Sequence, residues 1–209
     1  MDFNSQQYWA ERYAKGGDSG AGSKNHLSMF KAKTIRDIIR RFFLKSIAEL
    51  GCGDGMQVKE MIPFFQTERV KYDGFDISQP LIWSLREKFK NQETIVNFFS
   101  MSQLSEKYEA TISMDVIYHL VEDKVFEDYM AKLFDHSSKV VIIYSSNHED
   151  NEGSAAWVRH RRFDTWVTAN RPEWKLFQLI NNPWPYSKGM SPKKSRNTSV
   201  SNFYIYVKH

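Results

Sequence analysis

The chain has 209 residues, of which 41% are hydrophobic, 26% are charged and 15% are aromatic. This length and composition are typical of a single globular domain, and no run of about 18 apolar residues predicts a membrane-spanning helix or an apolar leader. Cys52 is the only cysteine, which excludes a disulfide framework and a cysteine-bound metal or iron–sulfur cluster. We therefore expect a cytoplasmic enzyme or binding protein.

The net charge of +4 is distributed unevenly along the chain. Residues 1–157 carry 19 Lys and Arg against 23 Asp and Glu, whereas residues 158–209 carry 10 against 2. Such a basic C-terminal quarter indicates either an anionic partner, for example a phosphorylated substrate or a nucleic acid, or a solvated basic face.

The predicted elements begin with a short aromatic-bearing helix over 4–14, a Gly/Ser-rich loop over 15–26 and an amphipathic helix over 27–42. Short apolar runs then alternate with helical patterns. The expected strands are 47–50, 72–76, 95–99, 110–114 and 140–144, and the expected helices are about 55–65, 78–90 and 122–135. Strands that alternate with helices predict a parallel sheet with helices on both faces.

The end of the chain departs from this alternation. Residues 174–180 and 203–207 have strand patterns, and the segment 181–200 between them has no helical pattern. Two strands without a crossover helix are most simply antiparallel neighbours. With no internal repeat and no linker, one domain over 1–209 is predicted.

The stretch "IAELGCGDG" places Gly51, Gly53 and Gly55 where the first strand should pass into a helix. Glycine there permits positive φ and lets a ligand approach the backbone closely, although a turn without a ligand is the alternative. Asp76 ends the second strand 25 residues after Gly51. An acidic side chain there can accept hydrogen bonds from both ribose hydroxyls of an adenosine ligand, or it caps the next helix, a role that Ser78 could also fill.

Two cofactor classes share this arrangement, nicotinamide dinucleotides and S-adenosylmethionine. The dinucleotide fingerprint is G-x-G-x-x-G, whereas this chain has G-x-G-x-G preceded by Glu49 and with Asp54 within the turn. A pyrophosphate would meet the negative charge of Asp54 at a helix N-terminus, which is unfavourable. The turn therefore favours S-adenosylmethionine, whose sulfonium and amino acid head group have no such conflict.

Together, "IAELGCGDG", "YDGFDIS" and "ATISMDVIYHLVED" resemble successive motifs of the class I S-adenosylmethionine-dependent methyltransferases over roughly residues 45–145. The resemblance implies an α/β Rossmann-like fold with a seven-stranded, mostly parallel sheet, an antiparallel C-terminal strand and helices on both faces. It also implies Glu49, Gly51, Cys52, Gly53 and Asp54 around the methionine part of the cofactor and Asp76 on the ribose. Ile77, Asp115 and Val116 are the expected contacts next to the second and fourth strands.

The chain departs from the family pattern after the third strand, where an acidic residue often meets the adenine amine. Here "NFFSMSQL" has no acid nearby, so adenine recognition is assigned to Met101 and to Ser100 or Ser102. The N-terminal "YWAERYAKGG" resembles lids of small-molecule methyltransferases. Trp9 and Tyr13 share a helix face with Arg12 beside them, so they either close over the cofactor or pack the helix on the sheet.

The methyl acceptor should lie beyond the fourth strand. His119 is the candidate general base because histidine titrates near neutrality, although it could instead anchor the loop by hydrogen bonds. Tyr118 is expected to line the acceptor pocket. In "WVRHRRF", the candidate substrate ligands are His160, Arg161 and Arg162, since arginine suits phosphate or carboxylate; an exposed basic helix is the alternative, in which Arg159 would face away from Arg161.

Several other chemistries are argued against by the sequence. "NPWPY" at 182–186 differs from the N-P-P-Y motif of amino-methylating enzymes and lies after the sixth strand rather than the fourth. There is no Pro-Cys nucleophile, no C-x-x-x-C-x-x-C motif for a radical mechanism and no His/carboxylate set at metal-ligand spacing.

We therefore predict a metal-independent methyltransferase that uses S-adenosylmethionine and yields S-adenosylhomocysteine. The expected acceptor is a hydroxyl or amine of a small polar molecule, with anionic and saccharide-type molecules as the candidates, the latter because the chain is similar to bacterial methyltransferases of saccharide pathways. The alternatives are an RNA or DNA methyltransferase that uses the basic C-terminal segment, a nicotinamide-dependent oxidoreductase, and a non-catalytic binding protein. Oligomeric state does not follow from the sequence.

Overall fold

The fold was analysed in a computed structural model, which describes residues 3–17, 25–191, 195 and 197–209. The predicted loop 15–26 therefore lies partly outside the described residues, as does part of 181–200. Within the described part of the chain, no helix is long and apolar enough to span a bilayer.

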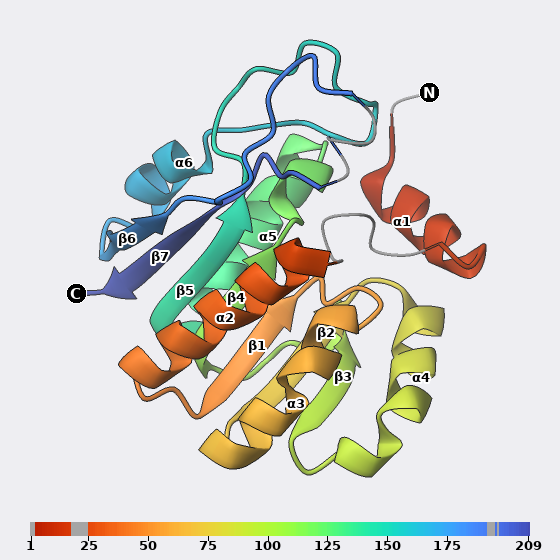
Figure 1. The fold of residues 1–209 in the computed structure, drawn as a ribbon, viewed down its shortest axis with the longest axis vertical. Helices are drawn as coiled ribbons and strands as arrows, with labels where there is room; N and C mark the ends of the chain where they lie inside the picture. Colours follow the sequence, from red (N-terminus) through yellow and green to blue (C-terminus); the bar gives the residue numbers. More distant parts are fainter. Residues whose placement is uncertain (1–2, 18–24, 192–194, 196) are drawn as a thin grey trace.

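A central sheet organises the molecule (Figure 1). Within the described residues it has seven strands in the order β3-β2-β1-β4-β5-β7-β6. The strands are β1 (Ser46–Leu50), β2 (Lys71–Asp76), β3 (Val96–Ser100), β4 (Tyr108–Met114), β5 (Ser137–Ser145), β6 (Trp174–Ile180) and β7 (Asn202–Lys208). β1 to β5 are mutually parallel, whereas β7 pairs antiparallel with both β5 and β6. The predicted fold, including its antiparallel C-terminal strands, is confirmed.

Helices cover both faces of the sheet. They are α1 (Ser5–Ala14), α2 (Asn25–Arg41), α3 (Met56–Glu68), α4 (Gln79–Lys88), α5 (Asp123–Asp135) and α6 (Phe163–Asn170), with short 3₁₀ turns η2 (Lys90–Gln92), η3 (Met101–Gln103) and η4 (Ile117–His119). In Figure 1, α2 and α3 cross in front of the sheet and α5 lies behind it.

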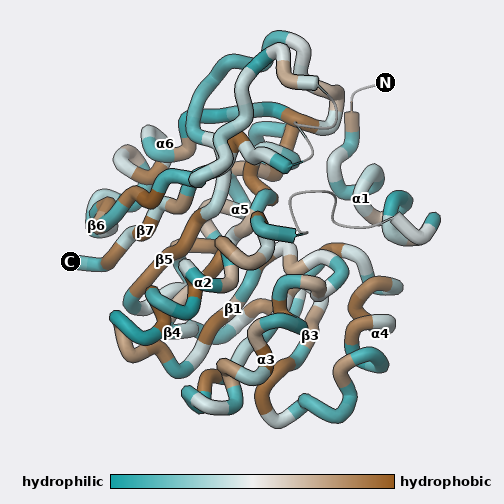
Figure 2. The backbone as a smooth tube through the Cα atoms, in the orientation of Figure 1, coloured by the Kyte–Doolittle hydropathy of each residue, from teal (hydrophilic) through white to brown (hydrophobic). Residues whose placement is uncertain are grey.

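Alternation along the buried strands divides the core into two layers. In β5, Ile142 and Tyr144 face the layer formed with α2, α3 and α4, whereas Val141 and Ile143 face the layer formed with α5 and α6. Successive strand side chains point to opposite faces, so strands covered on both faces are apolar throughout. Figure 2 shows this as brown, hydrophobic tube along the central strands and teal, hydrophilic tube in the upper loops.

The helix starts follow local chemistry. Asn4 caps α1, because its side-chain oxygen accepts a hydrogen bond from the backbone N–H of Gln7 at 2.8 Å. Pro80 lies in the first turn of α4, where a missing N–H costs nothing. The strand order reverses between β1 and β4, and in open α/β sheets ligands bind at such a switch point, beyond the carboxyl ends of the strands.

Candidate functional site

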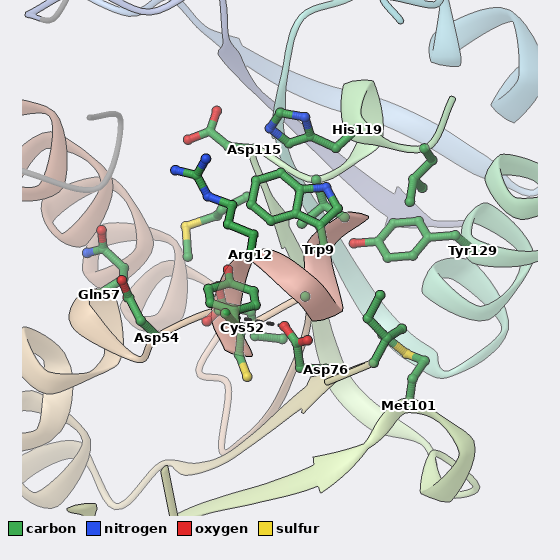
Figure 3. A pocket seen from close by; sticks show the side chains of 18 of the residues that line it. Trp9, Arg12, Cys52, Asp54, Gln57, Asp76, Met101, Asp115, His119 and Tyr129 are labelled. Atoms are coloured by element: carbon green, nitrogen blue, oxygen red, sulfur yellow. Dashed lines mark hydrogen bonds between the residues drawn. The ribbon is translucent and has the colours of Figure 1, made fainter. Parts of the chain in front are cut away.

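A cavity of about 350 Å³ opens at this switch point. Its lining comes from α1, α2, the start of α3, α5 and the segments that follow β1 to β5. Figure 3 shows Asp54 and Gln57 on one side, Met101 and Tyr129 opposite, and Asp115 and His119 beyond Trp9. The predicted residues that line the cavity are Trp9, Arg12, Tyr13, Glu49, Gly51, Cys52, Gly53, Asp54, Asp76, Ile77, Met101, Asp115, Val116, Tyr118 and His119.

The glycine turn after β1 is fixed by close packing. Gly51 has φ +77°, and a Cβ there would lie 2.6 Å from Cγ2 of Val116. The N–H groups of Gly51 and Cys52 both donate to the carbonyl of Phe75, at 2.7 and 3.0 Å. The Cys52 side chain is buried, and burial raises the pKa of its thiol, so it is not poised as a nucleophile.

Asp76 joins the ends of β1 and β2. Its Oδ2 accepts from the N–H of Gly53 at 3.1 Å and its Oδ1 accepts from the N–H of Ser78 at 3.0 Å. The Ser78 side chain itself makes no capping bond. Asp76 is buried, and burial raises the pKa of its carboxyl. A carboxylate oxygen can accept more than one hydrogen bond, so both oxygens of Asp76 can still accept a bond from a ligand.

Glu49 is a second buried carboxyl in the cavity. Its Oε2 accepts a hydrogen bond from the Tyr72 hydroxyl at 2.5 Å. Burial raises the pKa of Glu49 to about 7, and the Tyr72 bond opposes that rise. At neutral pH this side chain therefore changes charge in response to small changes around it.

Acidic side chains outnumber basic ones in the cavity lining. The acidic members are Glu49, Asp54, Asp76 and Asp115, and the basic members are Arg12 and Lys31. The cavity is therefore suited to a ligand with cationic groups and unsuited to one with several phosphates.

The predicted lid helix α1 lies over the cavity and contacts the body of the protein at its first residue. The backbone N–H and the hydroxyl of Ser5 donate to the two carboxylate oxygens of Glu122, at 2.8 and 2.6 Å. Tyr8 stacks on Trp157 with ring centroids 5.4 Å apart. The rings of Trp9 and His119 pack edge to face, with their centroids 4.6 Å apart. The aromatic residues of α1 thus pack against the loops after β4 and β5.

His119 is held in one tautomer by the backbone. Its Nδ1 lies 2.9 Å from the carbonyl oxygen of Trp157. A carbonyl only accepts, so Nδ1 carries the proton and Nε2 keeps a lone pair. Burial lowers the pKa of His119, so the ring is neutral at pH 7. For Tyr118, burial and then the charge of Asp115 raise the pKa, so its hydroxyl stays protonated.

Ser100 lies outside the cavity lining. Its side chain meets the hydroxyl of Ser102 at 3.1 Å, and its N–H donates to the side chain of Gln103, which closes the start of η3. Met101 and Ile77 do line the cavity. After β3, the cavity therefore offers the apolar side chain of Met101, next to that of Ile77 after β2, and no acidic side chain for an adenine amine.

The basic cluster after β5 does not gather at the cavity. Residues 157–162 form no helix, and α6 begins at Phe163. Arg161 donates to the carbonyls of Leu120 and Val121 and pairs with Asp123. His160 contacts Ser146 with Nδ1 at 2.7 Å, and Arg162 pairs with Asp164. None of these three side chains lines the cavity, and Arg161 braces the loop that follows Tyr118 and His119. Their role as substrate ligands stays a prediction.

Further residues to which the sequence analysis gave no role also line the cavity: Lys31, Gln57, Met114, Leu120, Tyr129 and Trp157. Lys31 is 2% exposed on the buried stripe of α2, and a lysine at an apolar helical position was the signal available for it. Among the described residues, no group of three or more His, Cys, Asp or Glu side chains could hold a metal ion.

No family model and no curated protein sequence matches the chain. Several solved structures, however, are similar to it in fold. N-methyltransferase NodS from Bradyrhizobium japonicum WM9, in complex with S-adenosylhomocysteine, is 12% identical and has a TM-score of 0.70, with 99% of each chain covered.

Magnesium protoporphyrin IX methyltransferase from Synechocystis PCC 6803, with bound S-adenosylhomocysteine, is 16% identical at a TM-score of 0.63, covering 99% of this chain and 96% of that one. The methyltransferase domain of bacterial CtHen1 is 18% identical at 0.63, covering 85% and 97%. The chain has the Rossmann-like class I methyltransferase fold. Within that methyltransferase fold, the cavity lies at the carboxyl ends of β1, β2 and β4.

Proposed function

We propose that this chain is an S-adenosylmethionine-dependent methyltransferase that transfers a methyl group to a hydroxyl or amine of a small polar molecule. The observation that carries the proposal is the cavity that brings the glycine turn, buried Asp76 and a neutral His119 together beneath the aromatic residues of α1. The bound S-adenosylhomocysteine of two solved structures with this fold supports it.

The described residues fit this cofactor. Oε1 of Gln57 is buried and has no hydrogen-bond partner, and the residue lines the cavity. A buried acceptor without a partner is costly, and an ammonium group of a ligand would supply the donor. Glycine backbone at the turn and the spare acceptor capacity of Asp76 suit the remainder of an adenosyl ligand.

Charge separates this cofactor from a nicotinamide dinucleotide. With Glu49, Asp54 and Asp76 around the turn, a pyrophosphate would be placed among carboxylates. A sulfonium and an ammonium would instead offset those charges. The balance of charge in the cavity therefore supports the adenosyl ligand over a dinucleotide.

For methyl transfer, the chain has to position the acceptor next to the methyl group and remove the acceptor proton. S-adenosylmethionine supplies a methyl group already activated by a sulfonium. Nε2 of His119 is the group that takes the acceptor proton, because Nδ1 is committed to Trp157. Trp9 and Tyr13 on α1 line the cavity and exclude water from the part of it that they fill. Alignment of the acceptor contributes several kcal/mol to lowering the barrier, on the order of 7–11 in ideal cases.

Titration calorimetry with S-adenosylhomocysteine and with NADH tests the proposal. Asp76→Asn should weaken S-adenosylhomocysteine by about tenfold or more, because a charge-assisted hydrogen bond is worth roughly 1.5–3 kcal/mol. Asp73→Asn is the matched control, since Asp73 lies on the same strand but accepts from Tyr108 instead of lining the cavity. Binding of NADH without S-adenosylhomocysteine would overturn the proposal.

A further inference from the structure

A buried lysine interrupts the apolar stripe of α2. Lys31 is 2% exposed, between Leu27 at 1% and Ile35 at 2%. Its Nζ lies 3.1 Å from Oδ2 of Asp115, which follows β4. Lysine is almost never fully buried unless it is paired, so this position is occupied by an ion pair where the helix pattern calls for an apolar side chain.

Stability does not account for the pair. Taking two charges out of water costs several kcal/mol per ion, and replacing a buried pair with apolar residues is often neutral or stabilising. Asp115 also has φ +56°, an uncommon backbone conformation for a residue other than glycine. Its second oxygen, Oδ1, accepts from the hydroxyl of Ser201 at 2.7 Å, immediately before β7. Three distant segments thus hold one ion pair at the wall of the cavity.

The Lys31–Asp115 ion pair offers hydrogen-bond donors to a ligand in the cavity but has no net charge of its own. The Lys31 ammonium has three N–H groups, gives one to Asp115 and lies over the Tyr144 ring, 5.6 Å from its centroid, so at least one N–H is left for an oxygen atom of a ligand. Both oxygens of Asp115 already accept one bond. An uncharged hydroxyl, carbonyl or ether oxygen matches these donors, whereas an anion would be repelled by Asp115 and by the carboxylates of the glycine turn.

Two other features lie at the same end of the cavity. Nε2 of His119 is a hydrogen-bond acceptor, because Nδ1 is bound to Trp157. Two aromatic rings that line the cavity adjoin the His119 ring: the centroid of Trp9 lies 4.6 Å and that of Tyr118 4.5 Å from its centroid. Aromatic walls pack against the faces of flat or ring-shaped molecules.

We infer that the methyl acceptor is an uncharged ring-bearing molecule with at least two oxygen groups, one bound by His119 and methylated, the other bound by Lys31. This rests on the proposed function and gives its acceptor a chemical class. The reacting hydroxyl loses its proton to Nε2 of His119 as its oxygen takes the methyl group from the sulfonium, which leaves a thioether. Lys31 then distinguishes such acceptors from molecules with a single oxygen and from anions.

The test uses protein saturated with S-adenosylhomocysteine and measures probe affinity by calorimetry. The uncharged probes are catechol and methyl glucoside; phenol lacks the second oxygen, and 2,3-dihydroxybenzoate and glucose 6-phosphate add an anion. We expect one uncharged probe to bind about tenfold or more tightly than its counterparts, and Lys31→Met to remove that advantage. Lys33→Met is the matched control, because Lys33 is exposed and pairs with exposed Asp37 on the same helix.

The variants also separate the two proposals. Should Lys31→Met leave Asp115 unpaired and the protein unfolded, Lys31→Met with Asp115→Asn removes both charges and keeps the test. Three outcomes overturn the inference alone: neither uncharged probe binds, probe affinity is unchanged in these variants, or the anionic probes bind more tightly. Failure of wild-type protein to bind S-adenosylhomocysteine overturns both the inference and the proposed function.

Discussion

At the scale of single residues, Glu49 predicts a pH dependence for the proposed cofactor site. Its pKa of about 7 means that roughly half of the free protein carries it protonated at neutral pH. A cationic ligand favours the carboxylate and lowers that pKa, so binding releases protons. We expect S-adenosylmethionine affinity to rise as the pH increases from about 6 to about 8.

Calorimetry of S-adenosylmethionine in buffers of different ionisation enthalpy measures this proton release directly. Glu49→Gln keeps an oxygen for the Tyr72 hydroxyl and removes the titrating group, so the release at neutral pH should disappear. Equal proton release by the wild type and the variant would show that another group titrates.

His119 provides a second prediction at this scale. His119→Asn keeps an N–H donor for the Trp157 carbonyl and removes Nε2. If Nε2 is the base, kcat should fall about 10²–10⁴-fold, while S-adenosylhomocysteine affinity stays within about threefold. Transfer of labelled methyl groups to an acceptor found by screening measures kcat, and calorimetry measures the affinity.

The pH profile of the wild type supplies an independent check on His119. Burial lowers its pKa, so the acid limb of kcat should lie below the ordinary range of histidine and activity should be flat from about pH 7 to about pH 9. If His119→Asn kept the kcat of the wild type, His119 would not be the base, and its role would be to anchor the loop through Trp157.

Sequence reasoning reaches the residues of this site only where backbone motifs mark them. The glycine turn and Asp76 were predictable because both lie at the ends of apolar strands, whose ends meet at one edge of a parallel sheet. Lys31 and Trp157 reach the cavity from α2 and from the segment after β5. Only the packing of those segments places their side chains, and no local pattern encodes that packing.

At the scale of elements, Gly55 couples the glycine turn to helix packing. It has φ +69°, and a Cβ there would lie 2.8 Å from Leu85 of α4 and 3.0 Å from Phe89. Gly55→Ala should therefore destabilise the protein by about 1–3 kcal/mol from the backbone conformation alone, with a further cost because the buried side chains must move.

Gly153→Ala is the matched control for this substitution. Gly153 has φ +76°, and no heavy atom lies within 4 Å of the position that a Cβ would take there, so the control carries the backbone cost without the packing cost. Urea denaturation of the two variants separates the two contributions. Equal losses of free energy of unfolding would mean that α4 shifts without strain to admit the methyl group.

The elements themselves followed from the sequence with one exception. The buried strands were predictable from their short, continuous apolar runs, and the helices from apolar stripes at helical spacing. The segment 157–170 was not, since a basic helix was only an alternative for 157–163 and no element was predicted over 163–170. In the structure Arg159 and Arg161 instead bind carbonyls of the loop after η4, and the backbone at 157–162 follows those bonds until α6 begins at Phe163.

At the scale of the whole molecule, the uneven charge of the sequence is partly balanced by the fold. Basic residues from the C-terminal quarter meet acidic residues from earlier in the chain. These pairs are Arg159 and Arg161 with Asp123, Arg171 with Asp135, and Lys188 with Glu152. Paired charges of this kind contribute little to the field that attracts a polyanion.

This balance gives a prediction that separates a small-molecule enzyme from one that acts on RNA. A protein that contacts about 6–10 phosphates loses about 10³–10⁵ in affinity between 50 and 200 mM salt. We expect an RNA of about 20 nucleotides, followed by fluorescence anisotropy, to bind weakly and to lose less than about tenfold over that range, as one or two contacts would give.

Substitution of three further basic residues of the C-terminal quarter completes the test. Lys193, Lys194 and Arg196, which lie outside the described residues, are changed together to Ala and compared with Lys33, Lys90 and Lys124, which are exposed and belong to local helix pairs. For a small-molecule enzyme, both triple variants should lower RNA affinity equally, because each removes the same charge from a non-specific surface. A steep salt dependence that only the first variant abolishes would instead favour a nucleic acid as the acceptor, since phosphate contacts would then be concentrated beside the loop between β6 and β7.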